Sequence, residues 1–240
     1  MGFSGATFLP LFIGRGGGGI TSRRSSITGA ATGATTVAEG TLVAVYDDTL
    51  GQSATGGITI IDGGQLVFNN YYPPAKATSI SGYGSTGQTT KYGSAGWVFY
   101  SDNLPYRYEY NVSSSITLTG DATITSRKDN LLLVGAGNIT SNGYSLTLGD
   151  SYNPETSVYN LTGATYTINK IIALSSGSLF SNAESIIKLG AANTFTGFYE
   201  NVGGTTILNN VSALSTPTLV GNTTIQFDTI TNATIGGMFG

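Results

Sequence analysis

The segment that decides the fold runs from Ile187 to Asn210 and reads IKLGAANTFTGFYENVGGTTILNN. It predicts a β-strand, a Thr- and Asn-rich turn, a short irregular crossing, a Gly-Gly step and a second strand that ends in paired asparagines. An earlier stretch, DGGQLVFNN from Asp62 to Asn70, resembles its second half, VGGTTILNN from Val202 to Asn210. Similar short strands between similar turns are typical of a chain that winds through repeated coils.

The composition of the chain favours an all-β protein over a helical one. Charged residues make up 10% of its 240 positions, against about 25% in ordinary globular domains. The remainder is rich in Gly, with 35 residues, and in Ser, Thr and Asn, all of which are weak in helix interiors. Tight turns and Thr-rich strand faces explain such a composition. No run approaches the roughly 18 consecutive apolar residues needed to cross a bilayer, so we expect no membrane span.

The residues that serve the commoner kinds of catalysis are missing. The chain has no Cys and no His, which excludes a disulfide framework, thiolate chemistry and the most frequent general base and metal ligand. Gly82 to Gly87 has the spacing of a dinucleotide-binding loop, but the sequence after it does not predict a helix. Asp121, Asp129 and Asp150 could supply the paired carboxylates of a polysaccharide-degrading enzyme; solvated turn residues are the interpretation we favour. We therefore expect no enzymatic activity, cofactor or metal.

Echoes within the second half predict the length of one coil. LTGDATIT from Leu118 is similar to LTGATYTI from Leu161, 43 positions later, and LVG at Leu133 recurs at Leu219, 86 positions later. Both separations are multiples of a coil of about 21 residues, a length typical of parallel β-helices. Residues 114–240 carry this signal continuously. The segment Asn182 to Leu189 is the one place where capping and charge spacing suggest a helix, of a single turn at most.

Alternation of apolar residues with Thr predicts which side chains lie inside the coils. We expect these residues to stack in rows along the axis of the solenoid. They are Ile116, Leu118, Ile124, Leu146, Leu148, Leu161, Ile168, Ile207 and Leu208.

Residues 1–36 predict an extended apolar arm followed by a hinge. Large apolar side chains gather near the start of the arm, namely Phe3, Phe8, Leu9, Leu11, Phe12 and Ile13. The hinge is a run of glycines with no preference for regular structure: Gly16, Gly17, Gly18 and Gly19. Leaving an apolar arm in water is costly, so we expect it to dock on a neighbouring copy or subunit by strand addition. Three arginines without an acid in this segment are too few to predict nucleic-acid binding.

Residues 37–70 predict the first β coils, whereas residues 71–113 change in composition. From Tyr71 to Tyr110 lie eight of the 14 tyrosines and the single tryptophan. We interpret this part as an insertion with a β-hairpin, whose arms are Gly96 to Tyr100 and Tyr106 to Val112. Its aromatic residues are candidates either for packing, in the lobe's own core or against a subunit, or for contact with a glycan. They are Trp97, Phe99, Tyr106, Tyr108 and Tyr110.

The segment that opens this section resembles the autotransporter-associated β-strand repeat of bacterial surface passenger domains. The match comprises LGAANTFTG from Leu189 to Gly197 and GGTTIL from Gly203 to Leu208. This chain departs from the family pattern by inserting Phe198 to Val202 where a Gly-Thr step is usual. The resemblance covers one repeat and implies a right-handed parallel β-helix. It implies function only loosely, because such coils serve as rigid stalks in adhesins, surface filaments and phage tail fibres and spikes.

From these observations we expect a parallel β-helix that acts as a structural subunit of an extracellular assembly or virion. Its partners would be further copies of the chain or other subunits of the same assembly, joined through the N-terminal arm. The alternative is a carbohydrate-binding adhesin or receptor-binding tip that contacts a cell-surface glycan. A polysaccharide-degrading enzyme is a third alternative, which the missing catalytic motifs disfavour.

Overall fold

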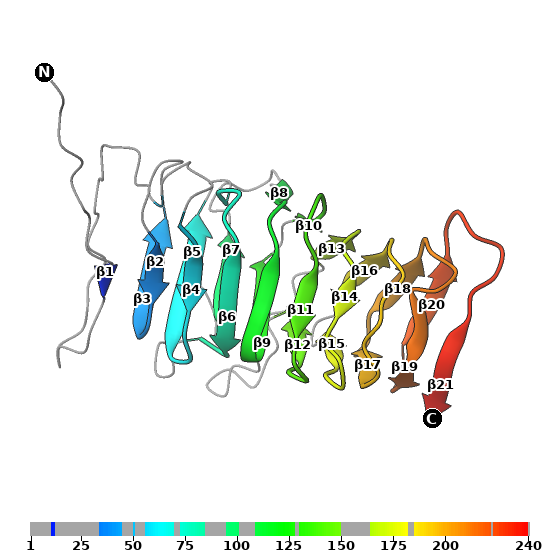
Figure 1. Cartoon of the computed structure of the whole chain (residues 1–240). Coiled ribbons are helices and arrows are strands. Elements are labelled where there is room, and N and C mark those ends of the chain that lie inside the picture. The colour runs from blue at the N-terminus through cyan, green and yellow to red at the C-terminus, as the bar shows by residue number, and fades with distance from the viewer. Residues whose placement is uncertain are drawn as a thin grey trace, which may run out of the picture.

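The computed structural model describes residues 11–12, 34–44, 50, 56–69, 73–84, 95–100, 109–127, 130–149, 164–181, 185–221 and 223–239. The regular structure of these residues is β-strand throughout, and no helix occurs among them. Neighbouring strands pair in parallel and stack from the N-terminal to the C-terminal end as an elongated ladder (Figure 1). The chain is a β-solenoid, so the predicted parallel β-helix is confirmed.

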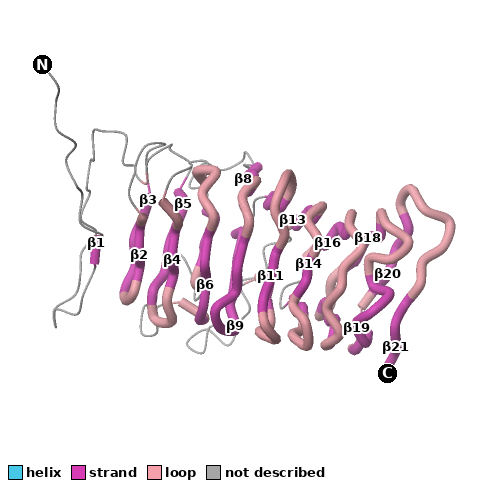
Figure 2. The backbone as a smooth tube through the Cα atoms, viewed as in Figure 1, coloured by secondary structure: helices cyan, strands magenta, loops and turns pink. Residues whose placement is uncertain are grey.

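The strands of successive coils build three faces, with loops at the corners (Figure 2). The first face contains β1 (Leu11–Phe12), β2 (Thr35–Val37), β4 (Ile58–Ile60), β6 (Thr78–Gly82), β11 (Ile139–Ser141) and β14 (Ile172–Ala173). The second face contains β3 (Gly40–Ala44), β5 (Gly64–Asn69), β7 (Trp97–Tyr100), β12 (Leu146–Leu148), β15 (Leu179–Ser181) and β17 (Phe198–Asn201).

Three strands run from the first face onto the second and join the two into one 15-stranded sheet. They are β9 (Ile116–Arg127), β19 (Leu214–Val220) and β21 (Ile235–Phe239). The third face is a separate six-stranded sheet of β8 (Glu109–Val112), β10 (Asn130–Leu133), β13 (Thr165–Ile168), β16 (Ile186–Leu189), β18 (Thr205–Leu208) and β20 (Thr224–Phe227).

The register of the third face confirms the predicted coil length wherever no long loop intervenes. Thr165 pairs with Ile186, Ile186 with Thr205, and Thr205 with Thr224, so one coil takes 21 or 19 residues. The echoes that suggested this length nevertheless join different faces. Leu133 lies on β10 of the third face, whereas Leu219 lies on β19 where that strand follows the second face. Similar turns recur at different corners of the coil. Two segments with similar sequences therefore share a kind of turn, but they need not lie on the same face.

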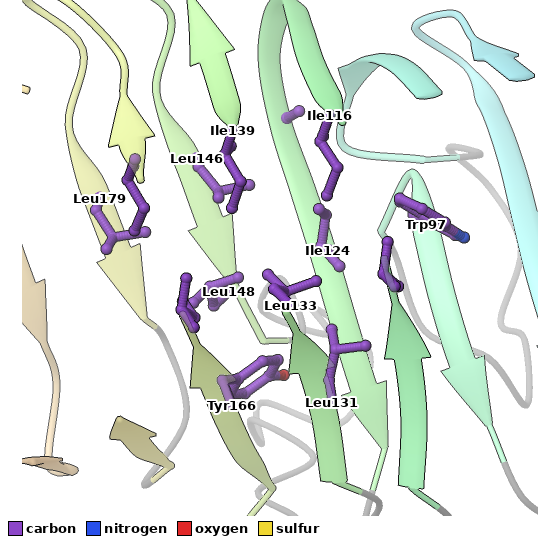
Figure 3. Packing of buried hydrophobic residues seen from close by; sticks show 14 of the residues in the cluster. Trp97, Ile116, Ile124, Leu131, Leu133, Ile139, Leu146, Leu148, Tyr166 and Leu179 are labelled. Atoms are coloured by element: carbon purple, nitrogen blue, oxygen red, sulfur yellow. The ribbon is translucent and has the colours of Figure 1, made fainter. Parts of the chain in front are cut away.

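The core is a continuous column of apolar side chains inside the three faces (Figure 3). Of the predicted core residues, Ile116, Leu118, Ile124, Leu146, Leu148, Ile168 and Leu208 are buried, which confirms the prediction for them. Leu161 lies outside the described residues. The prediction is wrong for Ile207, which is only half-buried. Successive side chains of a strand point to opposite faces, and on β18 the inward positions belong to Thr206 and Leu208.

The predicted helical turn at Asn182 to Leu189 is wrong for its described part. Residues Ile186–Leu189 form strand β16, which pairs in parallel with β13 before it and β18 after it. Ile187 and Leu189 point into the core and are fully buried. Partners on both sides therefore override the local helical preference, because they satisfy the backbone as well as the apolar side chains.

The predicted hairpin in residues 71–113 is also wrong. Strand β7 pairs in parallel with β5 and β9 on the second face. Strand β8 pairs in parallel with β10 on the third face. The described strands of this part therefore belong to the same ladder as those of residues 37–70 and 114–240, not to a separate lobe. Each strand takes its partners from the coils before and after it, because only there do its apolar residues meet the common core.

Candidate functional site

Three of the predicted interface or glycan-binding aromatics are part of the protein's own core. Trp97, Phe99 and Tyr110 are at most 1% exposed. Their rings contact one another, with centroids 5.1 Å apart for Trp97 and Phe99 and 5.3 Å apart for Phe99 and Tyr110. Phe68 stacks on Phe99 at 5.7 Å. Of the predicted alternatives, packing in the chain's own core therefore holds for these three residues, and contact of their rings with a glycan or a subunit is wrong. Tyr106 and Tyr108 lie outside the described residues.

The predicted arm is described only at Leu11 and Phe12. These two residues form strand β1, which pairs in parallel with Thr35 and Thr36 of the same chain. Here the backbone of the arm continues the chain's own first face, whereas we expected it on a neighbour. The other predicted arm and hinge residues lie outside the described residues: Phe3, Phe8, Leu9, Ile13, Gly16, Gly17, Gly18 and Gly19. Docking of these residues on another subunit remains a prediction.

The corner between the first and second faces carries an exposed row of polar and aromatic side chains, which we name the corner strip. It consists of Asp62, Tyr83, Asp121 and Tyr144, contributed by successive coils. Tyr83 is 49% and Tyr144 41% exposed. The Asp121 carboxylate accepts a hydrogen bond of 2.8 Å from the backbone N–H of Ser145, so it is tied to the coil that carries Tyr144. Exposed phenol rings can stack on a sugar ring, and carboxylates beside them can accept hydrogen bonds from the hydroxyl groups of the sugar.

Glycine allows the coils to approach closely within the corner strip. Gly82 adopts a φ of 87°, in the left-handed region that side chains disfavour. A Cβ atom at Gly82 would lie 2.3 Å from Oδ1 of Asp62. A side chain at this position would therefore displace Asp62 from its place beside Tyr83.

The environment of Tyr83 keeps its phenol protonated. Partial burial raises the pKa of Tyr83, and the negative charges of Asp121 and Asp62 raise it further. The hydroxyl group therefore stays a hydrogen-bond donor well into the alkaline range. A neutral donor between two acceptors is a pattern that matches the hydroxyl groups of a carbohydrate.

Sequence reasoning missed the corner strip, although one signal pointed to it. Asp62 precedes the Gly-Gly step of DGGQLVFNN, and Tyr83 follows Asp62 by 21 positions, which is the predicted coil length. Tyr83 lies within the dinucleotide-binding spacing of Gly82 to Gly87, which the structure does not support: β6 ends at Gly82 in a corner, and no described helix follows it. The separation of one coil length, and not the motif, is the signal that places Asp62 and Tyr83 side by side.

A buried lysine ties three coils together at another corner. Lys170 is 2% exposed, and its Nζ donates hydrogen bonds to the backbone carbonyls of Ser113 at 2.9 Å, Ala136 at 3.1 Å and Gly137 at 3.1 Å. Burial lowers the pKa of Lys170. The ammonium group satisfies carbonyls that the turn leaves without strand partners, so its role is structural.

The segment that resembles the autotransporter repeat contributes a second kind of bridge. The Asn193 side chain accepts a hydrogen bond of 2.9 Å from the backbone N–H of Ile172 and donates one of 2.9 Å to the carbonyl of Ala213. Nearby, the Tyr199 hydroxyl and Thr206 Oγ1 are 2.6 Å apart, and Asn201 Nδ2 donates to the same oxygen at 3.2 Å. These polar side chains are buried. Asn193 links neighbouring coils, whereas Tyr199, Asn201 and Thr206 form hydrogen bonds across the interior of a single coil.

Among the described residues no group of His, Cys, Asp or Glu is arranged to hold a metal ion. Of the three carboxylates considered for polysaccharide cleavage, Asp121 is exposed at a corner, while Asp129 and Asp150 lie outside the described residues. The described part of the chain contains no helix that could cross a membrane.

The fold and the described contacts define the class of this protein as a three-faced parallel β-solenoid. Comparison with protein-family models, with curated proteins and with solved structures gives no match. The resemblance to the autotransporter-associated repeat therefore stays a hypothesis, based on the residues from Leu189 to Leu208.

Proposed function

We propose that this protein is a structural subunit of an extracellular assembly or virion, such as a tail fibre, spike, decoration protein or surface filament. The observation that carries the proposal is the apolar column that runs without interruption through the described coils. Such a column makes the solenoid a stiff rod, because every coil is fixed to the next by backbone hydrogen bonds and by side-chain packing. Stiff rods with few charged residues suit a mechanical role more than a catalytic one.

In this proposal the N-terminal arm joins neighbouring subunits. The arm is apolar in sequence, and its described residues Leu11–Phe12 adopt the extended conformation that strand addition requires. Assembly of identical copies through the arm would need no cofactor. The extracellular location in this proposal is supported by the resemblance of residues Leu189 to Leu208 to a repeat of bacterial surface proteins.

Electron microscopy of the purified protein tests this function. We expect negatively stained rods or rings for the full chain, and a folded but unassembled protein after deletion of residues 2–14. Circular dichroism verifies that the deletion variant retains its β structure. A full chain that stays monomeric at high concentration would contradict the structural role, and assembly that survives the deletion would contradict the role of the arm.

A second candidate function, carbohydrate binding by an adhesin or receptor-binding tip, is supported by the corner strip. Tyr83 would stack on a sugar ring, with Asp62 and Asp121 as hydrogen-bond acceptors. Binding of the chain to a glycan array tests this candidate, with Tyr83→Ala expected to abolish binding and Tyr83→Phe to retain most of the stacking. Equal binding by the wild type and Tyr83→Ala would exclude the strip as the glycan site.

A further inference from the structure

Exposed aromatic side chains recur on every second coil along the corner between the first and second faces. They are Tyr83, Tyr144 and Phe198, which we name the aromatic row, and they are 49%, 41% and 49% exposed. Tyr83 directly follows β6, Tyr144 shortly precedes β12, and Phe198 begins β17. Strands β6, β9, β12, β15 and β17 are paired in this order. The coil of β9 therefore separates the first two aromatic residues, and the coil of β15 separates the last two.

The spacing of the aromatic row follows from the strand ladder. Because neighbouring strands lie about 4.8 Å apart, residues on alternate coils recur every ~9.5 Å along the axis of the solenoid. The intervening coils carry short polar side chains at this corner, namely Asp121 on β9 and Ser176 just before β15, and both are exposed. Along the axis, an aromatic side chain therefore alternates with a polar one.

Hydrogen bonds between short side chains and the backbone fix the coils at this corner. The Asp121 carboxylate accepts the hydrogen bond of 2.8 Å from the backbone N–H of Ser145. Oγ of Ser145 accepts one of 3.1 Å from the N–H of Ser178. Oγ of Ser178 in turn accepts one of 2.9 Å from the N–H of Phe198. Four successive coils are tied together in this way, so the backbone that carries Tyr144 and Phe198 is preorganised and loses little freedom when a ligand binds.

This pattern matches a straight glycan with β-1,4 linkages. Successive sugar rings of such a glycan are turned by half a rotation, so every second ring presents the same face, and a unit of two rings is close in length to two coils. The apolar face of a ring can stack on each aromatic side chain. Hydroxyl groups of the ring between them then meet Asp121 or Ser176. A helical α-1,4-linked glycan turns its ring faces away from a straight row.

We propose that the aromatic row binds an extended β-1,4-linked polysaccharide that lies parallel to the axis of the solenoid. Alternate sugar rings stack on Tyr83, Tyr144 and Phe198. The inference rests on the second candidate function, carbohydrate binding, and adds the class of glycan, its direction and two further stacking residues. The row spans about five sugar rings, one for each coil from β6 to β17.

The length of the glycan tests whether the three aromatic residues act together. Isothermal titration calorimetry measures binding of the disaccharide, tetrasaccharide and hexasaccharide of β-1,4-linked glucose and of β-1,4-linked N-acetylglucosamine. For one or both series we expect the affinity to rise by at least about 10-fold from the disaccharide to the hexasaccharide, because additional rings reach the second and third aromatic side chains. The α-1,4-linked hexasaccharide of glucose is the control and should show no such rise.

Single substitutions test each contact. Tyr144→Ala and Phe198→Ala should each lower the affinity for the hexasaccharide by about 10-fold, because one stacking contact is lost. Val202→Ala is the matched control: Val202 is 49% exposed, like Phe198, but it lies beyond the other end of β17. Its affinity should equal that of the wild type. All four side chains are exposed, and circular dichroism verifies that the variants keep their β structure.

The outcomes also separate this inference from the function on which it rests. An affinity that does not change with glycan length, or that Tyr144→Ala and Phe198→Ala leave unchanged while Tyr83→Ala abolishes binding, would overturn the row and leave carbohydrate binding at Tyr83 standing. Equally tight binding of the α-1,4-linked hexasaccharide would overturn the class of glycan. A chain that binds no carbohydrate, either in solution or on a glycan array, would overturn both.

Discussion

The side-chain carbonyl of Asn193 accepts a hydrogen bond of 2.9 Å from the backbone N–H of Ile172, one coil earlier. Because the same side chain donates to Ala213 one coil later, a single residue holds three successive coils in register. Ile172 begins β14, which pairs only with β11 among the described strands, and Ala213 directly precedes β19, so the strand ladder of the first face is interrupted between them. Asn193 therefore replaces there the hydrogen bonds that the ladder supplies along the faces.

Replacing Asn193 with Ala should destabilise the protein by about 3 kcal/mol, because two buried backbone groups lose their partners. Urea denaturation followed by circular dichroism measures the free energy of unfolding. Asn138→Ala is the control, since Asn138 is exposed and its loss should change stability by less than about 0.5 kcal/mol. Equal stability of the two variants would show that the Asn193 bridge contributes nothing.

Lys170→Met should lower the free energy of unfolding by about 2 kcal/mol, because the carbonyls of Ser113, Ala136 and Gly137 lose a charged donor. Methionine keeps the apolar stem, so packing changes little. Lys170→Arg should not restore stability, since a planar guanidinium does not fit three carbonyls that converge on one point. Thermal melting of the three proteins checks the order. A fully stable Lys170→Arg variant would argue against the convergent geometry.

Burial of the Tyr199 phenol should make the folded protein less stable at alkaline pH. Complete burial raises the pKa of Tyr199, with a smaller opposing effect from its hydrogen bond to Thr206. Above pH 10 the unfolded chain loses this proton while the folded chain keeps it, so stability falls as pH rises. The difference in unfolding free energy between wild type and Tyr199→Phe should shrink by about 1.4 kcal/mol per pH unit above 10. Urea titrations from pH 8 to 11.5 measure it, and a constant difference would contradict the burial of a neutral phenol.

Two neighbours on β12 test the inward and outward positions of a coil. Leu146 is fully buried and Thr147 partly exposed. Leu146→Asp should cost about 4 kcal/mol or more through a buried unpaired charge. Thr147→Asp should cost less than about 1 kcal/mol. Chemical denaturation ranks the pair, and a mild effect of Leu146→Asp would mean that the core column is not continuous at this coil.

Much of the architecture followed from short-range patterns in the sequence. Thr alternating with Ile or Leu from Ile116 to Leu148 predicted the strands and their inward residues, because side chains of a strand alternate with a period of two. Repeated short segments, 43 and 86 positions apart, predicted a coil of about 21 residues. Alternation within a strand and repetition along the chain can both be read without knowing which strands pair, so the sequence alone was enough to predict them.

The tertiary structure decided which coil and which face each segment joins. The aromatic segment reads locally as a hairpin, yet Trp97 and Tyr110 belong to different faces of one core. Asp62 and Tyr83 come together only when the coils are stacked. Pairing between coils is non-local: a strand is placed by the backbone and apolar partners that neighbouring coils offer it, and long loops change how many residues separate those partners.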